Sequence, residues 1–319
     1  MTDSGASFRY VFGPVPSRRL GRSLGVDLVP RKVCSFDCVY CQVGRTTRRT
    51  TERGHFVPVP EVLDDLRRKL ATAPRPDYIT LAGSGEPTLN LDLATVIDGI
   101  RRITDVPIAL LTNGSLLHDP DVRRAAVGVD VALPTLDAAD EATFQAVHRP
   151  AEGLTLEKVI AGLEAFRRDF AGQIWLEVFV VTGLNDRPEQ IDALRAIIER
   201  INPDRIQLNT AVRPTADEGV LALGEPELEA VARRLGPKAA VIADFRRDAE
   251  PASFAAQRQE VLDTIRRRPV TLDDIAAGMG VHPQEAAKYV HELLAHGEIV
   301  IERRGEREYY RGTNQEGCG

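Results

Sequence analysis

Residues 22–41 read RSLGVDLVPRKVCSFDCVYC, a strand-like stretch followed at once by three cysteines. Its first part alternates apolar and other side chains, as a half-buried strand does. Its second part places Cys34, Cys38 and Cys41 in a C-x3-C-x2-C spacing, and the 319 residues contain four cysteines in all. Three thiolates this close suit one face of a cubane iron–sulfur cluster and leave its fourth corner without a protein ligand. The stretch therefore predicts a metal site that follows a strand and has an open corner for a substrate or cofactor.

A zinc knuckle is the alternative interpretation of the same cysteines. Structural zinc is closed by four protein ligands, so this interpretation needs one more ligand beyond the three cysteines. Only His55 or Cys318 could supply it. The cysteine spacing by itself leaves both kinds of metal site open.

The pattern of strand, loop and helix recurs along the chain. Short apolar strands are predicted at 22–30, 77–83, 107–114, 129–137, 174–183 and 205–214. Helical spacing is found at 59–73, in the stretch that runs through Ile100, and at 119–126, 138–147, 155–168, 187–200 and 225–235. Strands that alternate with helices of this length indicate a parallel sheet with right-handed crossovers. About six such units favour an α/β fold of the partial (β/α)6 TIM-like barrel type, in which the chemistry gathers at the carboxyl ends of the strands.

The pattern changes near residue 249, so we expect a barrel domain over 1–248 and a small second domain over 249–319. Three helices and a hairpin are predicted there, with a short tail, which is the element order of a winged helix. Its third helix carries Glu285 and Glu292 against Lys288. Helices that read a major groove usually carry more positive charge, so we expect a docking or oligomerisation module and no sequence-specific DNA binding.

Polar residues stand in or directly after several of the predicted strands. Glu86 follows the second strand within GSGEPTL (83–89), where a carboxylate can receive an ammonium group. Glu177 interrupts an apolar strand, so it either faces the barrel lumen or pairs with an arginine. Asn185 and Asp186 end that strand, where we expect them to cap the next helix.

The composition, with 43% hydrophobic residues, is ordinary for a packed soluble protein. No apolar run approaches the roughly 18 residues that a membrane span needs, and the start has no signal-peptide core, so we expect no membrane partner. Few cysteines argue against a disulfide framework and for a reducing compartment. These observations predict a cytoplasmic location.

The net charge of −6 does not favour the protein as a whole as a nucleic-acid binder. Around the cysteines, however, basic residues are concentrated: Arg18, Arg19, Arg22, Arg31, Lys32, Arg45, Arg48, Arg49 and Arg53. This concentration indicates either an anionic substrate or a solvated loop rich in arginine. Both interpretations stay open at this point.

CSFDCVYC resembles the cluster-binding signature of radical S-adenosylmethionine (SAM) enzymes, in which an aromatic residue precedes the third cysteine. Tyr40 occupies that position. The resemblance implies that Cys34, Cys38 and Cys41 hold a 4Fe-4S cluster whose fourth iron chelates SAM. It also implies reductive cleavage of SAM to methionine and a 5'-deoxyadenosyl radical that abstracts hydrogen, and an electron donor such as flavodoxin or ferredoxin.

The same resemblance assigns SAM contacts to residues that end three predicted strands. Gly85 and Glu86 match the element that receives the SAM amino group, although Ser84 interrupts its glycines. The ribose-side element and the Ser-Leu-Asp element, here with threonine in place of serine, are matched by Thr112, Asn113, Thr135 and Asp137. The resemblance thus predicts a SAM pocket at the strand ends.

Motifs over about residues 8–215 resemble the branch of radical SAM proteins that contains the tRNA wyosine-base synthases. Those synthases use a second cluster, and the additional cysteines it needs are absent here. We therefore infer the branch without its reaction, and expect hydrogen abstraction from an anionic RNA base or small metabolite. An iron–sulfur transcriptional sensor, with the winged helix as its DNA-binding output, is the alternative function.

Overall fold

The structure is a computed structural model that describes residues 8–17, 19–212, 215–243, 252–267, 269–279, 281–304 and 307–313. The chain divides into two compact units, Gly13–Phe245 and a second unit of Met1–Phe12 with Arg246–Gly319. A domain boundary after residue 248 stays a prediction. Arg18 and Cys318 lie outside the described residues.

An eight-stranded sheet forms the centre of the larger unit, with the order β1-β2-β5-β6-β7-β8-β9-β10. All ladders from β2 to β10 are parallel. The strands are β1 (Val11–Ser17), β2 (Gly21–Val26), β5 (Tyr78–Leu81), β6 (Ile108–Thr112), β7 (Val131–Pro134), β8 (Gln173–Val180), β9 (Arg205–Thr210) and β10 (Ala239–Val241). The predicted α/β class is confirmed, and the open strand order agrees with a partial barrel.

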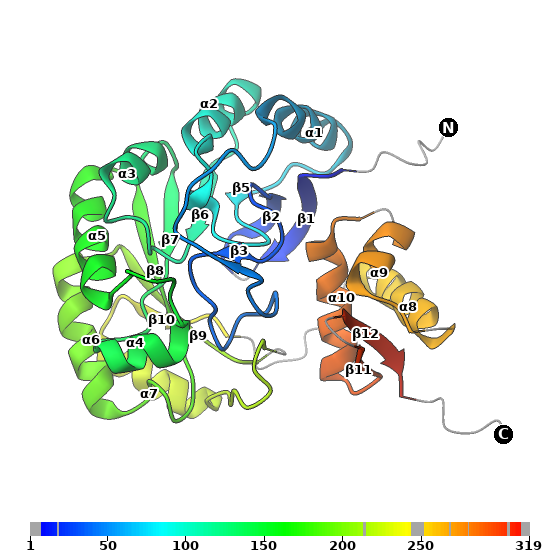
Figure 1. The fold of residues 1–319 in the computed structure, drawn as a ribbon. Coiled ribbons are helices and arrows are strands. Elements are labelled where there is room, and N and C mark those ends of the chain that lie inside the picture. The colour runs from blue at the N-terminus through cyan, green and yellow to red at the C-terminus, as the bar shows by residue number, and fades with distance from the viewer. Residues whose placement is uncertain are drawn as a thin grey trace. The chain divides into compact units, whose positions relative to one another are not determined.

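Helices cover the outer side of this sheet (Figure 1). They are α1 (Val59–Thr72), α2 (Leu93–Ile103), α3 (Pro120–Ala126), α4 (Glu141–His148), α5 (Leu156–Asp169), α6 (Pro188–Ile201) and α7 (Glu225–Leu235), with the short 3-10 helix η1 (Pro87–Leu89). Capping side chains start several of them. Asp140 accepts a hydrogen bond from the Thr143 amide at the start of α4, and Thr155 accepts one from the Lys158 amide at the start of α5.

Two strands of the sheet were not predicted from the sequence. β1 contains a glycine and two prolines, which are typical of turns, so its sequence does not predict a strand. β10 has three residues, too few to show an alternating pattern. A further pair of two-residue strands, β3 (Val33–Cys34) and β4 (Arg48–Arg49), brackets the cysteine loop.

The two faces of β8 differ in character, because successive side chains of a strand point to opposite faces. Leu176, Val178 and Val180 are fully buried on one face. The other, which we call the inner face, carries Trp175, Glu177 and Phe179. Its lower end is closed by an apolar cluster of Leu20, Ala109, Val131, Leu133 and Trp175. Polar side chains follow toward the carboxyl ends of the strands, so the inner face can accept a ligand only at that end.

The second unit contains α8 (Ala252–Arg267), α9 (Leu272–Met279) and α10 (Pro283–Ala295), followed by the antiparallel pair β11 (Ile299–Arg304) and β12 (Arg307–Gly312). Side chains of these helices and of the hairpin form one hydrophobic core, which includes Leu262, Ile275, Val290 and Tyr310. The assignment of this unit as a winged helix stays a prediction. Among the described residues, no helix combines the length and the apolar character that a membrane crossing requires.

Candidate active site

The cysteine loop, residues 33–44, is fixed by backbone hydrogen bonds to the end of α4 and the residues after it. The amides of Asp37 and Val39 donate to the carbonyls of His148 and Val147, both over 2.9 Å. The amide of Ala151 donates to the Ser35 carbonyl over 2.8 Å. The loop is therefore held in one conformation by residues more than 100 positions away.

Each of the three cysteine sulfurs lies beside a polar nitrogen. The Asn113 amide nitrogen is 3.5 Å from Cys34 Sγ, and the Lys32 ammonium is 3.4 Å from Cys41 Sγ. His148 Nδ1 is 3.2 Å from Cys38 Sγ. Groups that can donate to sulfur thus surround the three cysteines from three sides.

The electrostatics of the Cys34 and Cys38 thiols favour a cluster that carries positive irons. Burial, with the Glu86 carboxylate nearby, raises the pKa of the Cys34 thiol to about 12. Burial and the other two sulfurs raise the pKa of Cys38 well above its usual value. Three adjacent thiolates are therefore unfavourable unless a cation neutralises them, and the residues present fit an iron–sulfur cluster in this respect.

A single metal ion fits the same residues poorly. Over the described ranges, no three His, Cys, Asp or Glu side chains are grouped closely enough to hold one ion. In an iron–sulfur cluster each cysteine binds a different iron, so the sulfurs need not converge on one point. His55, one of the two possible zinc ligands, is 72% exposed and bonds to Asp92 over 2.8 Å. The zinc knuckle has no support among the described residues.

Glu86 is buried, and both of its carboxylate oxygens are hydrogen-bonded within the protein. Oε1 accepts bonds from the Thr88 amide and hydroxyl and from the Thr112 hydroxyl, and Oε2 accepts one from the Asn113 amide. Burial raises the pKa of this carboxyl in spite of these four bonds. Glu86 and Thr112 thus join the end of β5 to the end of β6, and the predicted role of Glu86 as an ammonium acceptor stays a prediction.

Gly85 is required by a close approach of two backbone segments. A Cβ at this position would lie 1.9 Å from the Val33 carbonyl oxygen, which accepts a hydrogen bond from the Glu86 amide over 3.1 Å. The expected close approach therefore exists, but its partner is the start of the cysteine loop. Any side chain at residue 85 would displace that loop.

Asp27 supports the segment just before Gly85. Its carboxylate accepts hydrogen bonds from the amide and the hydroxyl of Ser84. Gly83 has a φ of +134°, and a Cβ there would strike the Asp27 carboxyl group. Burial raises the pKa of Asp27 to about 6, with the Ser84 hydrogen bonds opposing the shift.

The Tyr40 side chain contacts Phe179 of β8 and Asp137, which follows β7. Its ring stacks on Phe179 with 3.9 Å between ring centroids, and its hydroxyl donates to Asp137 Oδ2 over 2.5 Å. Asp137 Oδ1 accepts the Phe179 amide over 2.6 Å. Burial raises the pKa of Asp137 well above its usual range. Tyr40 and Asp137 thus form one unit that fixes the third cysteine of the loop.

The predicted capping role of Asn185 and Asp186 is wrong. Helix α6 begins at Pro188 with Arg187 as its cap. The buried Asn185 side-chain amide donates to the carbonyls of Asp137 and Phe179, both over 2.8 Å. Asn185 thereby stabilises the two residues that contact Tyr40. Its interior hydrogen bonds compete with capping, because the side chain cannot face both ways.

For Glu177 the sequence left two alternatives, a position facing the barrel lumen or a pair with an arginine, and the structure shows both. It lies on the inner face, and its Oε2 pairs with the Arg19 guanidinium over 2.9 Å. Asn209 donates to its Oε1 over 3.1 Å. Both charged side chains keep some exposure, 18% for Arg19 and 16% for Glu177. The backbone of half-buried Thr135 pairs with that of Glu177 on the neighbouring strand, so Thr135 lies beside Glu177.

Several arginines near the cysteines are tied to other protein groups. Ion pairs link Arg22 to Asp77, Arg45 to Asp37 and Asp217, and Arg48 to Glu52. The guanidinium groups of Arg53 and Arg49 donate to backbone carbonyls. These contacts favour a structural role for these arginines. Arg19, which is paired with Glu177, is a cation of the inner face.

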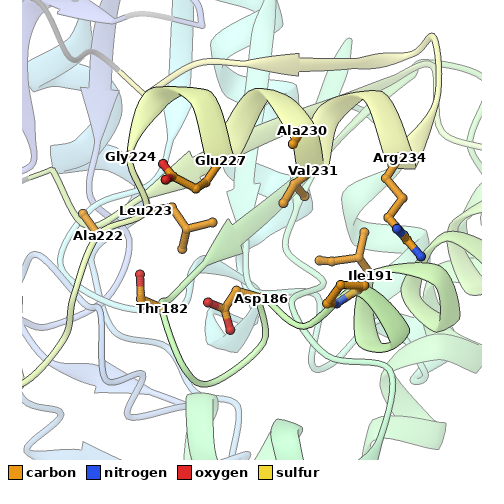
Figure 2. A pocket seen from close by; sticks show the side chains of 11 residues that line it. Thr182, Asp186, Ile191, Ala222, Leu223, Gly224, Glu227, Ala230, Val231 and Arg234 are labelled. Carbon is orange, nitrogen blue, oxygen red and sulfur yellow. The ribbon is translucent and has the colours of Figure 1, made fainter.

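A separate cavity of 490 Å³ lies between α6 and α7 (Figure 2). Apolar side chains such as Ile191, Leu223 and Val231 form much of its wall, and Asp186 and Glu227 reach it from opposite elements. No residue of the cysteine loop lines it. We therefore do not assign the chemistry of the cysteines to this cavity.

Comparison with known proteins identifies the family. The model of the radical SAM superfamily matches residues 28–195, which is more than half of the chain. The chain belongs to the radical SAM superfamily. Radical SAM proteins are enzymes that use a 4Fe-4S cluster and SAM, so the predicted class and cofactors are confirmed.

Individual relatives and structural neighbours cover different shares of the chain. A UPF0026 protein of Helicobacter pylori strain 26695 is 31% identical over 306 residues, which are 94% of this chain and 96% of that protein. GTPase Obg of Brachyspira hyodysenteriae is 35% identical over 301 residues, 93% of this chain but 44% of that protein, so this chain spans less than half of it. A radical SAM methyltransferase from Sphaerobacter thermophilus shares the fold, with a TM-score of 0.52 and 16% identity over 70% of this chain and 67% of that one.

The sequence analysis did not predict the role of two residues at this site. His148 was not singled out, and Asn185 was assigned to a helix cap. Both act over long sequence separations, 110 positions from Cys38 to His148 and 48 from Asp137 to Asn185. A lone histidine at a helix end carries no periodic signal that would reveal such a contact. The branch of the tRNA wyosine-base synthases stays a prediction.

Proposed function

We propose that this enzyme cleaves SAM reductively on a 4Fe-4S cluster held by Cys34, Cys38 and Cys41. The observation that carries the proposal is the set of three thiols at the carboxyl edge of a parallel sheet, each with a nitrogen 3.2 to 3.5 Å from its sulfur. When bound, the cluster supplies an electron that splits SAM into methionine and a 5'-deoxyadenosyl radical able to remove hydrogen from a substrate. An external donor such as flavodoxin or ferredoxin would deliver that electron in the cytoplasm.

Several residues around the cysteines would bind SAM or position the residues that bind it. Asn113 and Thr135 are half-buried at the strand ends and would contact the cofactor. Gly85, Glu86 and Thr112 would also contact SAM, as the family resemblance implies, while their contacts with the protein hold the strand ends and the loop start in place. Tyr40 and Asp137 would fix the loop beside the third cysteine in the same way.

The substrate would bind on the inner face beyond the cysteines. Arg19 is partly exposed there, and its partner Glu177 has a second hydrogen bond from Asn209 that would hold it in place when Arg19 turns to a ligand. A guanidinium binds a carboxylate or phosphate through two parallel hydrogen bonds. These contacts favour an anionic substrate, either a small metabolite or a base within RNA.

The proposal is tested by 5'-deoxyadenosine formation. The protein is reconstituted anaerobically with iron and sulfide, reduced with dithionite, supplied with SAM and assayed by chromatography. We expect product from the wild type and from the matched control Cys318→Ala, and none from the triple Cys34/Cys38/Cys41→Ala variant. Product from the triple variant would contradict the assignment. Salt-dependent binding of duplex DNA, without SAM binding, would instead support the sensor function.

A further inference from the structure

His148 ends α4 and lies buried against the cysteine loop. Its ring packs among Phe36, Phe144 and Tyr40, with ring centroids 4.8, 5.3 and 6.0 Å away. Its carbonyl accepts the Asp37 amide, so its backbone and its ring both contact the loop. A ring held on several sides has one orientation, and that orientation directs Nδ1 at Cys38 Sγ over 3.2 Å.

We propose that His148 is a positioning residue that donates a hydrogen bond from Nδ1 to the Cys38 sulfur and thereby raises the reduction potential of the cluster. The proposal rests on the proposed function, because it takes Cys38 as a cluster ligand. It goes beyond that function by assigning to this chain a residue that adjusts how easily the cluster accepts its electron.

The direction of the hydrogen bond follows from the chemistry of the sulfur. A cysteine bound to iron is a thiolate and has no proton to give, so the ring nitrogen must be the donor. The other ring nitrogen, Nε2, is 3.5 Å from Asp137 Oδ2, which accepts the Tyr40 hydroxyl over 2.5 Å. A neutral ring carries one N–H, and the thiolate is the nearer acceptor, so the geometry favours the proton on Nδ1.

The effect on the potential follows from charge. Reduction adds an electron whose charge is partly carried by the cluster sulfurs. A hydrogen bond to a ligand sulfur stabilises the reduced state more than the oxidised state. Asn113 and Lys32 lie beside the other two sulfurs over longer distances, 3.5 and 3.4 Å. The bond from His148 is the shortest of the three, and His148 is 2% exposed, so its removal should have a measurable effect.

Two variants separate the hydrogen bond from the packing of the ring. His148→Phe keeps an aromatic ring among Phe36 and Phe144 but has no donor, whereas His148→Asn keeps an N–H near the Nδ1 position with less packing. The matched control His55→Asn removes an exposed histidine whose partner is Asp92. Each reconstituted protein is titrated redox-potentiometrically, with the reduced cluster detected by electron paramagnetic resonance.

We expect the ratio of reduced to oxidised cluster at a fixed potential to fall about tenfold in His148→Phe, which is 59 mV for a one-electron couple. His148→Asn and His55→Asn should stay close to the wild type. An unchanged potential in His148→Phe would overturn the proposal. An equal fall in His148→Asn would also overturn it, because the loss would then come from packing.

A measurement on the wild type keeps the proposal testable if the variants fail to fold. Protein labelled with ¹⁵N-histidine is reconstituted and reduced, and pulsed electron paramagnetic resonance is used to detect coupling of the cluster spin to ¹⁵N and to an exchangeable proton. We expect both couplings. Their absence in protein that still forms 5'-deoxyadenosine would overturn the role of His148 alone, whereas a wild type that assembles no cluster would overturn the proposed function with it.

Discussion

Two regions of the molecule differ in the hydrogen bonding of their polar groups. One is the sheet edge beside the cysteines, and the other is the cavity between α6 and α7. Asn185 and Asp186 are neighbours in sequence, yet Asn185 is buried behind the cysteine edge with three internal hydrogen bonds. Asp186 faces the outer cavity (Figure 2), and among the described residues neither it nor Glu227 is in an ion pair. The side chain of Asn185 is hydrogen-bonded within the protein, whereas the carboxylates of Asp186 and Glu227 face the cavity. Substitutions should therefore be costly at the first region and cheap at the second.

The largest effect is expected for Gly85→Ala, because the added methyl group would lie 1.9 Å from the Val33 carbonyl oxygen. Backbone must move to relieve this contact, so we expect loss of cluster assembly and destabilisation of more than about 3 kcal/mol. The matched control is Gly224→Ala at the cavity. The nearest atom there is the mobile carboxylate of Glu227, so we expect a cost of at most about 1 kcal/mol.

Iron content after reconstitution and urea unfolding measure these two effects. Equal behaviour of the two alanine variants would show that the cysteine edge is no more tightly packed than the cavity. It would remove the basis of the comparison.

The next largest effect is a difference in stability between variants of Asn185 and of Asp186. Asn185→Ala leaves the Val181 amide and the Asp137 and Phe179 carbonyls without their partner, and we expect a loss of about 3 kcal/mol in the free energy of unfolding. Asp186→Asn should change stability by no more than about 0.5 kcal/mol. Urea unfolding followed by circular dichroism measures both, and a cost for Asp186→Asn as large as that for Asn185→Ala would contradict the difference between the regions.

A pH dependence is expected from Asp27, which supports the Gly83–Gly85 segment. Burial raises its pKa from 3.8 to about 6 in the folded protein. The folded state therefore favours the protonated carboxyl, and the stability from this group is fully present below about pH 4 and lost as the pH rises through 6. The shift corresponds to at most about 3 kcal/mol. Unfolding of wild type and Asp27→Asn at pH 4 and pH 7 should show the variant gaining relative stability at the higher pH, and parallel profiles would refute the assignment.

The sequence was sufficient for features with local signals. The alternation of strand and helix predicted the parallel sheet, and the strand ends predicted where Tyr40, Asn113 and Asp137 would gather. It was not sufficient for the partners of individual groups. The oxygens of Glu86 accept hydrogen bonds from Thr112 and Asn113, 26 and 27 positions away, which no local pattern could predict. The contact of Glu86 with SAM stays a prediction.

The same limit explains the other differences. β1 was hidden by its prolines, and Asn185 was assigned to the helix that follows it because capping is a local rule. The bond from His148 to Cys38 depends on how α4 packs on the loop, which no spacing within the sequence encodes. The capping role of Asn185 was wrong because a local rule does not show contacts between elements, whereas the α/β class followed from periodicity along the chain.

The central claim is that Cys34, Cys38 and Cys41 hold a cluster whose fourth iron binds SAM. The most direct measurement is electron paramagnetic resonance of the anaerobically reconstituted and reduced protein, recorded before and after SAM is added. We predict a cluster signal that requires all three cysteines and whose g-values shift on addition of SAM. A signal that stays unchanged in excess SAM would contradict the claim, since a cluster with no open iron leaves SAM nothing to coordinate.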